Sequence, residues 1–361
     1  MSYQNFYNIF KRDNNKIDMY DKQINLFRIN NILMLEVTIF LFFLFPELIQ
    51  SQLYIDIKVN TVGNVQIISN DYINTLPQVK VKGNTLSLIN KKISVDSIND
   101  TISLVYETSL NNFSNMFKNI EIITDVHMYN QIGSNNTFSY MFQNCINLKT
   151  FIYDIQYNQK FSVKDMRGMF YNCISLESFD FKNLYMNVYK FEFWTTSCSW
   201  FSCYSTINYG YYYNDIDMSY TFYNCQNLKA IYSNNNECNY ISNMRQMFYN
   251  CISLESIHLS KFNTKANVYI DLSYMFFNCI NLKIISFSRS LTVSYMDKMF
   301  YNCTSLESID LTGFSLSSEY YLNMSKLFYN CINLTTVSGI NQKLLYLMNN
   351  NYKTFQMYHL S

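Results

Sequence analysis

The chain has few of the residues that tight turns and most active sites require. Its 361 residues include only 7 glycines, 2 prolines and 3 histidines. The scarcity of glycine and proline disfavours a compact sandwich with many tight turns, and it leaves no glycine-rich loop for a phosphate group. Strong net charge is also missing, because 27 basic and 26 acidic residues nearly cancel and no block of one sign occurs. We therefore expect no nucleic-acid partner.

An internal repeat fills most of the chain. Its clearest copy runs from Met244 to Leu259. The first half has apolar residues at i, i+3, i+4 and i+7, the spacing of one face of a short helix. The second half has the L-x-x-L-x-L spacing typical of a leucine-rich-repeat strand. One copy cannot bury both apolar faces alone, so several copies must stack.

A cysteine at the end of each predicted helix after the first, which ends at Ile120, sets the period. Successive cysteines are 24 to 28 residues apart, except for one step of 52 between Cys173 and Cys225. We interpret that step as two turns of 26 residues, with one turn hidden between these cysteines. Because the aligned cysteines face the core, we predict a buried column of thiols in preference to disulfides. The column consists of Cys145, Cys173, Cys225, Cys251, Cys279, Cys303 and Cys331.

Three copies carry a more specific motif. They read MFYNCISLESFDF from Met169, MFYNCISLESIHL from Met247 and MFYNCTSLESIDL from Met299. This pattern resembles the BspA-like leucine-rich repeat family, whose units read roughly M-F-x-N-C-x-S-L-x-x-L-D-L, over about residues 113–340. The resemblance implies display on, or export to, a microbial cell surface. It also implies attachment or ligand binding, with no enzymatic activity.

These patterns predict an α/β leucine-rich-repeat solenoid, in which each turn of about 26 residues contributes a short helix and a parallel strand. We place about nine turns at 113–340, with an irregular segment at 185–217, and assign 341–361 to a C-terminal tail. Residues 53–112 contain short alternating runs punctuated by Gly63, Pro77 and Gly83. They predict a β-rich N-terminal cap that shields the first turn from water. An independent small β domain is the alternative.

An asparagine precedes the cysteine position in every legible copy, from Asn119 to Asn330. Asparagine tolerates the left-handed backbone conformation that ends many helices, and its amide can hydrogen-bond to loop backbone. We therefore predict a structural role for this row of asparagines.

The N-terminal segment has the features of an export signal. Residues 32–45 are apolar except for Glu36 and Thr38, and basic residues precede them. Fourteen residues are too few to span a bilayer comfortably, but they suit the core of a signal peptide. We assign residues 1–52 to a leader that is either a cleaved signal peptide or an uncleaved signal anchor. A buried core helix is the third interpretation.

One residue of each predicted strand lies between the last two apolar positions and should point outward. These residues form one row along the solenoid, the kind of face on which repeat proteins commonly bind partners. A strand face that only contacts solvent is the alternative. The candidate binding residues are Asp180, Tyr232, His258, Ser286 and Asp310.

The irregular segment 185–217 supports two interpretations. Its Trp194, Trp200, Tyr211 and Tyr212 form a candidate aromatic recognition patch. Alternatively, the segment is a degenerate turn that fills its core with larger side chains. A disulfide among Cys198, Cys203 and Cys238 is compatible with either interpretation.

Groups suited to catalysis or metal binding are dispersed. Asp310, the carboxylate expected on the same face as His258, lies two turns away, at about 10 Å, beyond hydrogen-bond reach. We expect no enzymatic activity, no metal site and no cofactor. Exposed sequons in an exported chain would accept N-linked glycans. The candidate acceptors are Asn99, Asn112, Asn135 and Asn323.

The sequence thus predicts an exported cell-surface or secreted protein that binds a protein or glycan on another cell or in the matrix. If the N-terminal segment is not cleaved, it also contacts the membrane. The alternative of a different class is a cytoplasmic repeat scaffold, or a repeat array without a specific ligand.

Overall fold

The structure is a computed structural model that describes residues 52–130, 136–154, 161–181, 184–185, 189–199, 202–212, 216–232, 241–260, 262, 269–288, 291–316 and 324–339. The tail at 341–361 and, apart from Gln52, the leader at 1–52 lie outside these ranges. Among the described residues, no helix is long and apolar enough to cross a membrane.

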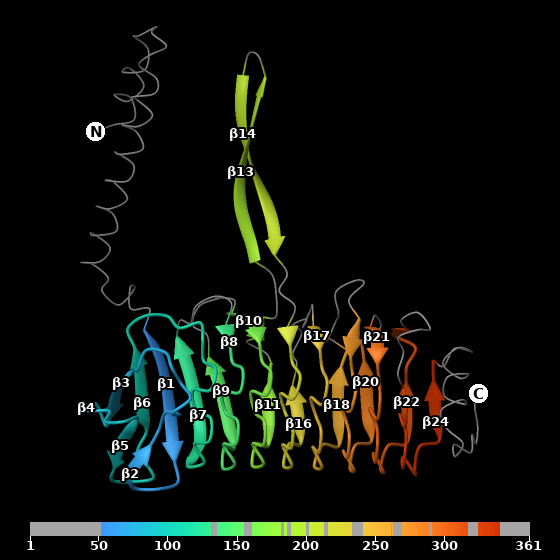
Figure 1. The fold of residues 1–361 in the computed structure, drawn as a ribbon, viewed down its shortest axis with the longest axis horizontal. Coiled ribbons are helices and arrows are strands. Elements are labelled where there is room, and N and C mark those ends of the chain that lie inside the picture. Colours follow the sequence, from blue (N-terminus) through green and yellow to red (C-terminus); the bar gives the residue numbers. More distant parts are fainter. Residues whose placement is uncertain are drawn as a thin grey trace. The chain divides into compact units, whose positions relative to one another are not determined.

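The N-terminal strands form an antiparallel sheet that continues into the repeats. β1 (Leu53–Val59) pairs antiparallel with both β6 (Ile102–Tyr106) and β7 (Ile123–Asn130). On its far side β7 pairs parallel with β9 (Thr150–Asp154), so one sheet changes from antiparallel to parallel at β7 (Figure 1). Alternate residues of β1 are buried, as a period of two requires. The remaining strands of this region are β2 (Gly63–Gln66), β3 (Gln78–Val81), β4 (Asn84–Leu86) and β5 (Lys92–Val95).

The repeats contribute two series of parallel strands. The first series contains the L-x-x-L-x-L segments, as their spacing predicts, and its paired members lie in register. It comprises β9, β11 (Ser178–Asp180), β16 (Ala230–Tyr232), β18 (Ser256–Leu259), β20 (Ile284–Phe287), β22 (Ser308–Asp310) and β24 (Thr336–Ser338). The second series lies before the segments that were predicted to be short helices, which we call the Met/Phe segments. Its strands form one sheet in the order β12-β10-β15-β17-β19-β21-β23, and β8 pairs with β10. It comprises β8 (Asn136–Thr137), β10 (Phe161–Asp165), β12 (Leu184–Tyr185), β15 (Ile216–Asp217), β17 (Ile241–Asn243), β19 (Ile270–Asp271), β21 (Leu291–Tyr295) and β23 (Phe314–Leu316).

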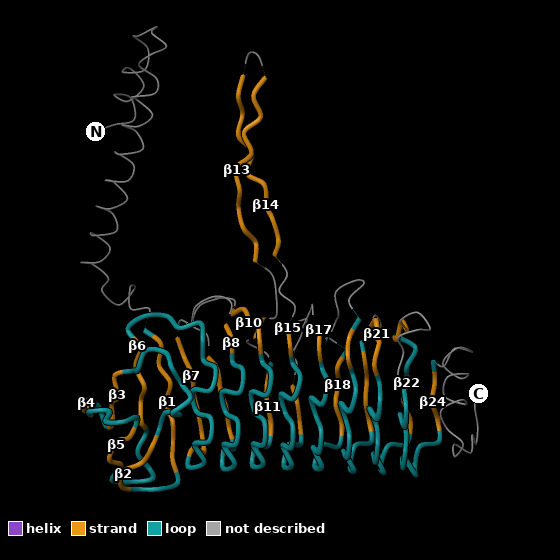
Figure 2. Tube along the Cα trace, viewed as in Figure 1, coloured by secondary structure: helices purple, strands orange, loops and turns teal. Residues whose placement is uncertain are grey.

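The predicted α/β class is wrong, because the chain is a parallel β-solenoid and its described residues contain no helix (Figure 2). The Met/Phe segments form tight corners instead of helical turns. Within a corner, the Met141 amide donates to Phe138 three residues back, at 3.0 Å, whereas the Phe142 amide donates to Met169 of the next turn, at 2.8 Å. An α-helix needs bonds to the fourth residue back. Such a corner therefore uses half of its amides to hold neighbouring turns together.

The turn predicted between Cys173 and Cys225 is also absent from the stack, because the two flanking corners bond directly. The amides of Gly168 and Phe170 donate to the carbonyls of Ser219 and Thr221, both at 2.9 Å. The extra residues instead contain an antiparallel hairpin of β13 (Tyr189–Ser199) and β14 (Ser202–Tyr212) (Figure 1). The prediction of about nine turns is therefore too high.

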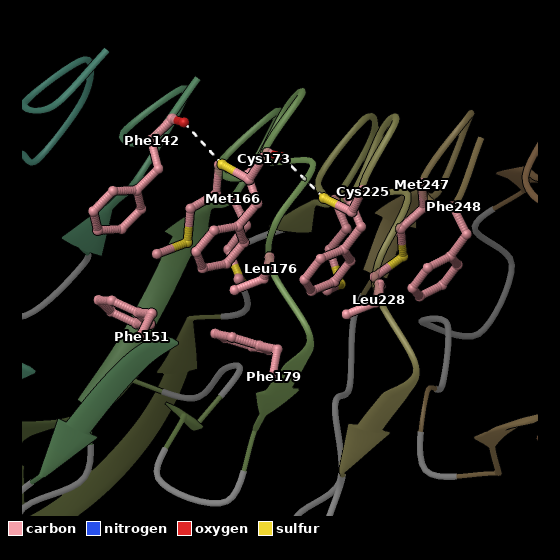
Figure 3. Close-up of a cluster of buried hydrophobic side chains, with 14 of the residues drawn as sticks. Phe142, Phe151, Met166, Cys173, Leu176, Phe179, Cys225, Leu228, Met247 and Phe248 are labelled. Carbon is pink, nitrogen blue, oxygen red and sulfur yellow. Dashed lines mark hydrogen bonds between the residues drawn. The ribbon is translucent and has the colours of Figure 1, made fainter. Parts of the chain in front are cut away.

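The core consists of columns of equivalent side chains from successive turns. Phe142, Phe170, Phe222 and Phe248 are buried and stack with ring centroids 5.4 to 5.5 Å apart. Methionine, leucine and cysteine side chains line the same interior (Figure 3). Each turn thus buries its apolar positions against the equivalent positions of its neighbours, which explains why one copy could not fold alone.

Candidate binding surface

The first series of strands presents the row of outward residues that the sequence singled out. Backbone register places Asp180 beside Tyr232, and His258 beside Ser286. Asp310 pairs in the same way with Ser338 of β24. Tyr232 is 53% exposed, His258 and Asp310 are exposed, and Asp180 and Ser286 are half-buried. We call this surface the strand face.

Hydrogen bonds between neighbouring turns link the side chains of the strand face. His258 Nδ1 lies 2.9 Å from Ser286 Oγ, and the Ser338 hydroxyl donates to Asp310 Oδ1 at 3.0 Å. A serine hydrolase would also need a carboxylate on the second nitrogen of the histidine. Asp310 instead accepts bonds from Ser338 and from the amide of Thr312, at 2.9 Å. These contacts bring His258 and Ser286 together, but the Asp310 carboxylate is bonded to Ser338 and Thr312.

The strand face extends onto the antiparallel sheet, which the sequence did not indicate. Asp56 of β1 pairs with His127 of β7, and His127 Nε2 lies 2.8 Å from Asp154 Oδ2. Beside them, the rings of Tyr54 and Tyr129 stack at 5.2 Å. The pKa of Tyr129 is raised to about 12, mainly by burial and secondly by the negative charge of the neighbouring Asp56. Alternation within β1 and β7 was visible in the sequence, but their register was not.

A ladder of alternating charges borders the strand face. Lys229 Nζ lies 3.2 Å from Glu177 of the preceding turn, and Lys283 lies 3.7 Å from Glu255. Each pair is exposed and contributes at most about 1 kcal/mol. The alternation continues over successive turns as Lys149, Glu177, Lys229, Glu255, Lys283 and Glu307.

The cysteine column is buried and its thiols are free, as the repeat register predicts. Each thiol donates to the carbonyl of a phenylalanine in the preceding turn; for Cys173 and Phe142 the distance is 3.0 Å (Figure 3). Burial raises the pKa of Cys279 and Cys331 to about 12. Burial likewise raises the pKa of the other thiols in the column. These thiols therefore stay protonated, which suits packing and disfavours reaction.

The asparagine row has the predicted left-handed backbone but a different hydrogen-bond partner. Asn144 and Asn172 have φ of 62° and 60°. Their side chains bond to asparagines of neighbouring turns, not to loop backbone. Asn172 Nδ2 donates to Asn144 Oδ1 at 3.1 Å, and Asn224 Nδ2 donates to Asn172 Oδ1 at 2.6 Å. The row is a continuous ladder of amides along the corners.

The remaining predicted sites are divided between described and undescribed residues. In the hairpin, Trp194 is opposite Ile207, while Tyr211 and Tyr212 are opposite Lys190 and Tyr189. Cys198 is directly opposite Cys203. Trp200, Cys238, Asn135 and Asn323 lie outside the described residues.

The two described glycosylation candidates differ in accessibility. Asn99 is exposed, whereas Asn112 is half-buried. The Asn112 side-chain oxygen also accepts a bond from the amide of Ser114, at 3.0 Å. Asn99 is therefore the better acceptor of the two. Across the described ranges, no three histidine, cysteine or acidic residues are grouped to hold a metal ion.

Comparison with known proteins gives one family. A family model described as "Mycoplasma protein of unknown function, DUF285" matches residues 87–202 and 216–342. The break between the two matched segments falls within and just after β14. No curated protein and no solved structure matches the chain.

Proposed function

Since the chain belongs to the DUF285 family of Mycoplasma proteins of unknown function, we propose its function from the geometry of its surface. It is a non-enzymatic binding or adhesion module for a protein or glycan. The observation that carries this proposal is the strand face, on which Tyr232, His258 and Asp310 from separate turns are all exposed.

The strand face is suited to binding because its side chains are spaced and oriented before a partner arrives. Parallel strands of neighbouring turns lie about 4.8 Å apart, so one partner could contact several turns at once. The bonds from His258 to Ser286 and from Ser338 to Asp310 restrict these side chains. Restricted side chains lose less conformational entropy on binding.

We place this activity outside the cell. The repeats resemble those of the BspA-like leucine-rich repeat surface proteins, and residues 32–45 resemble the core of a signal peptide or signal anchor. In that setting the partner is a protein or glycan on another cell or in the matrix. An uncleaved N-terminal segment would add contact with the membrane.

Binding to an array of extracellular-matrix proteins and cell-surface glycans tests the proposal. The variant Tyr232→Ala/His258→Ala/Asp310→Ala should bind the strand-face ligand about tenfold more weakly, which corresponds to about 1.4 kcal/mol. Lys164→Ala, which changes an exposed residue of β10, is the control and should bind normally. Equal binding by the triple variant would exclude the strand face, and a chain that binds nothing on the array would contradict the binding function.

A further inference from the structure

The corners carry a second surface, separate from the strand face. Its first element is a column of aromatic rings at the position before each ladder asparagine from Asn172 to Asn330. These rings are half-buried, except for that of Tyr329, which is 47% exposed. Neighbouring rings are nearly parallel, with centroids 4.5 Å apart for Tyr171 and Tyr223 and 4.7 Å apart for Tyr301 and Tyr329. Because the ring faces cover one another, ring edges and hydroxyl groups are the parts available to solvent. The column consists of Tyr171, Tyr223, Tyr249, Phe277, Tyr301 and Tyr329.

The second element is a column in which tyrosines alternate with cations from Tyr140 to Lys298. The Arg167 guanidinium lies 5.8 Å from the ring centroid of Tyr140, and that of Arg245 lies 5.2 Å from Tyr274. Lys298 Nζ lies 4.8 Å from the Tyr274 centroid and donates to its hydroxyl at 2.9 Å. Cation–π contacts of this kind hold the cations in place.

The two columns form one continuous surface, which we call the corner face. Tyr220 of the second column contacts Tyr223 of the first, with centroids 6.1 Å apart, and Tyr274 contacts Phe277 at 5.9 Å. Gly168 makes room for Tyr140, because a Cβ at this glycine would lie 2.3 Å from Cε1 of the ring. The corner face is thus built into the backbone of the turns.

The charge that the corner face presents to solvent is positive. Arg167 and Arg245 are 45% and 37% exposed, whereas their partners Asp165 and Asp271 are 23% and 27% exposed. Both carboxylates also accept backbone amides of their own corners, at 2.8 and 2.7 Å. The two carboxylates therefore stabilise their corners, and they leave part of each guanidinium available to an anion from outside.

The spacing of the cations identifies the kind of anion. Arg167, Arg245 and Lys298 come from every second corner of the stack, so these three cations are separated by about 9.5 Å. Lys326 adds an exposed cation on the corner after Lys298. Phosphates of one DNA strand recur every ~3.4 Å of the axis. Side chains on one side of an extended peptide recur every ~6.7 Å. A linear polysaccharide with an acidic group on every second sugar alternates anionic and neutral units. This alternation matches that of cationic and neutral residues on the corner face from Tyr140 to Lys298.

We propose that the corner face binds a linear acidic polysaccharide that lies along the stacked turns. The arginines pair with carboxylate or sulfate groups, for which guanidinium geometry is well suited. The tyrosine hydroxyls of the first column, which lies beside them, hydrogen-bond to the neutral sugars. This site is distinct from the strand face, and its activity does not depend on that of the strand face.

Binding of the full chain to hyaluronan, which carries a carboxylate on every second sugar, tests the proposal. Arg167→Gln/Arg245→Gln/Lys298→Gln should weaken binding about tenfold, and added salt should weaken it in the wild type. The matched control, Lys149→Gln/Lys229→Gln/Lys283→Gln, removes the same charge from every second turn beside the strand face. This control variant should bind hyaluronan normally, as should the strand-face triple variant.

Three outcomes would overturn the proposal. The first is no binding of hyaluronan by the wild type, and the second is that the control variant weakens binding as much as the corner variant does. The third is that DNA binds as tightly as hyaluronan and is weakened to the same extent by the corner variant. If the corner variant fails to fold, Tyr223→Phe/Tyr249→Phe retains the stack and removes only hydroxyls. That variant should also bind hyaluronan more weakly, and undiminished binding would count against the proposed role of the hydroxyls. Since array binding through the strand face uses other residues, either proposal can fail alone.

Discussion

At the scale of single residues, left-handed backbone conformations shape each corner. Tyr140, Gln246 and Lys298 have φ of 55°, 55° and 51°, and each precedes the ladder asparagine by four positions. Such a conformation costs a non-glycine residue roughly 1–2 kcal/mol. Each corner thus has two such residues, and the ladder asparagine could be predicted from the sequence because asparagine tolerates this conformation. The other position could not, because tyrosine, glutamine and lysine have no such preference.

Gly339 provides a residue-scale prediction. A Cβ at Gly339 would lie 2.1 Å from the backbone nitrogen of Thr312, whereas one at Gly83 would meet nothing within 4 Å. Both glycines have positive φ, at 75° and 80°. Gly339→Ala should therefore lower the free energy of unfolding by about 1–3 kcal/mol more than Gly83→Ala, because only the first change overpacks. Urea unfolding of both variants measures this difference, and equal losses would refute the close contact.

The thiol column gives stability a dependence on alkaline pH. The folded-state pKa of Cys279 is raised from an ordinary value of 9.0 to about 12. Below pH 9 both states keep the proton; above it the unfolded state loses the proton first, so stability falls as pH rises toward 12. At pH 10 the loss should be about 1 kcal/mol for each thiol.

Urea midpoints from pH 8 to pH 10 measure the effect of the thiols, with Cys251→Ala/Cys279→Ala as the comparison. This variant will be less stable at every pH but should lose less stability on going to pH 10. An unchanged pH slope would show that the thiols do not couple to folding.

At the scale of elements, the corner and a short helix place apolar residues at the same spacing. Both bury positions i, i+3, i+4 and i+7, so the periodicity that predicted helices could not distinguish the two. The strands of the first series follow an alternation that few other structures produce, and their prediction was sound. The second series is shorter in several turns, as in the two-residue strands Ile216–Asp217 and Ile270–Asp271, and the sequence pattern alone did not reveal it.

The amide ladder is an element-scale feature that substitution can dissect. Asn172→Gly keeps the left-handed backbone but removes the bonds to Asn144 and Asn224, at an expected cost of about 1–3 kcal/mol. Asn172→Ala should cost about 1 kcal/mol more, because alanine is strained at a φ of 60°. Unfolding in urea ranks the variants. An Asn172→Gly protein as stable as the wild type would show that the amide ladder does not stabilise the fold.

At the scale of the whole repeat array, two surface positions alternate between residue types from one turn to the next. Lysine and glutamate alternate beside the strand face, and tyrosine alternates with arginine on the corner face. On these two surfaces each turn therefore meets unlike residues in its neighbours, which favours one register of stacking over its alternatives. The candidate residues of the strand face could be selected from the sequence by strand position. The corner face could not, because the predicted helix placed those residues differently.

The hairpin is an insertion between turns that already stack on each other. Replacing residues 189–212 by a short glycine–serine linker should therefore leave the urea midpoint almost unchanged. The retained bonds from Gly168 and Phe170 to the next corner are the reason. Binding through the strand face should also persist in this variant. A large loss of stability would mean that the hairpin supports the stack.

Export is the claim on which the proposed function most directly depends. The decisive measurement is topology in the native cell, with a tag at Ser361 and protease added to intact cells. We predict that protease removes the tag while a cytoplasmic marker survives. A tag that becomes accessible only after permeabilisation would contradict a surface-exposed binding module and favour an intracellular scaffold.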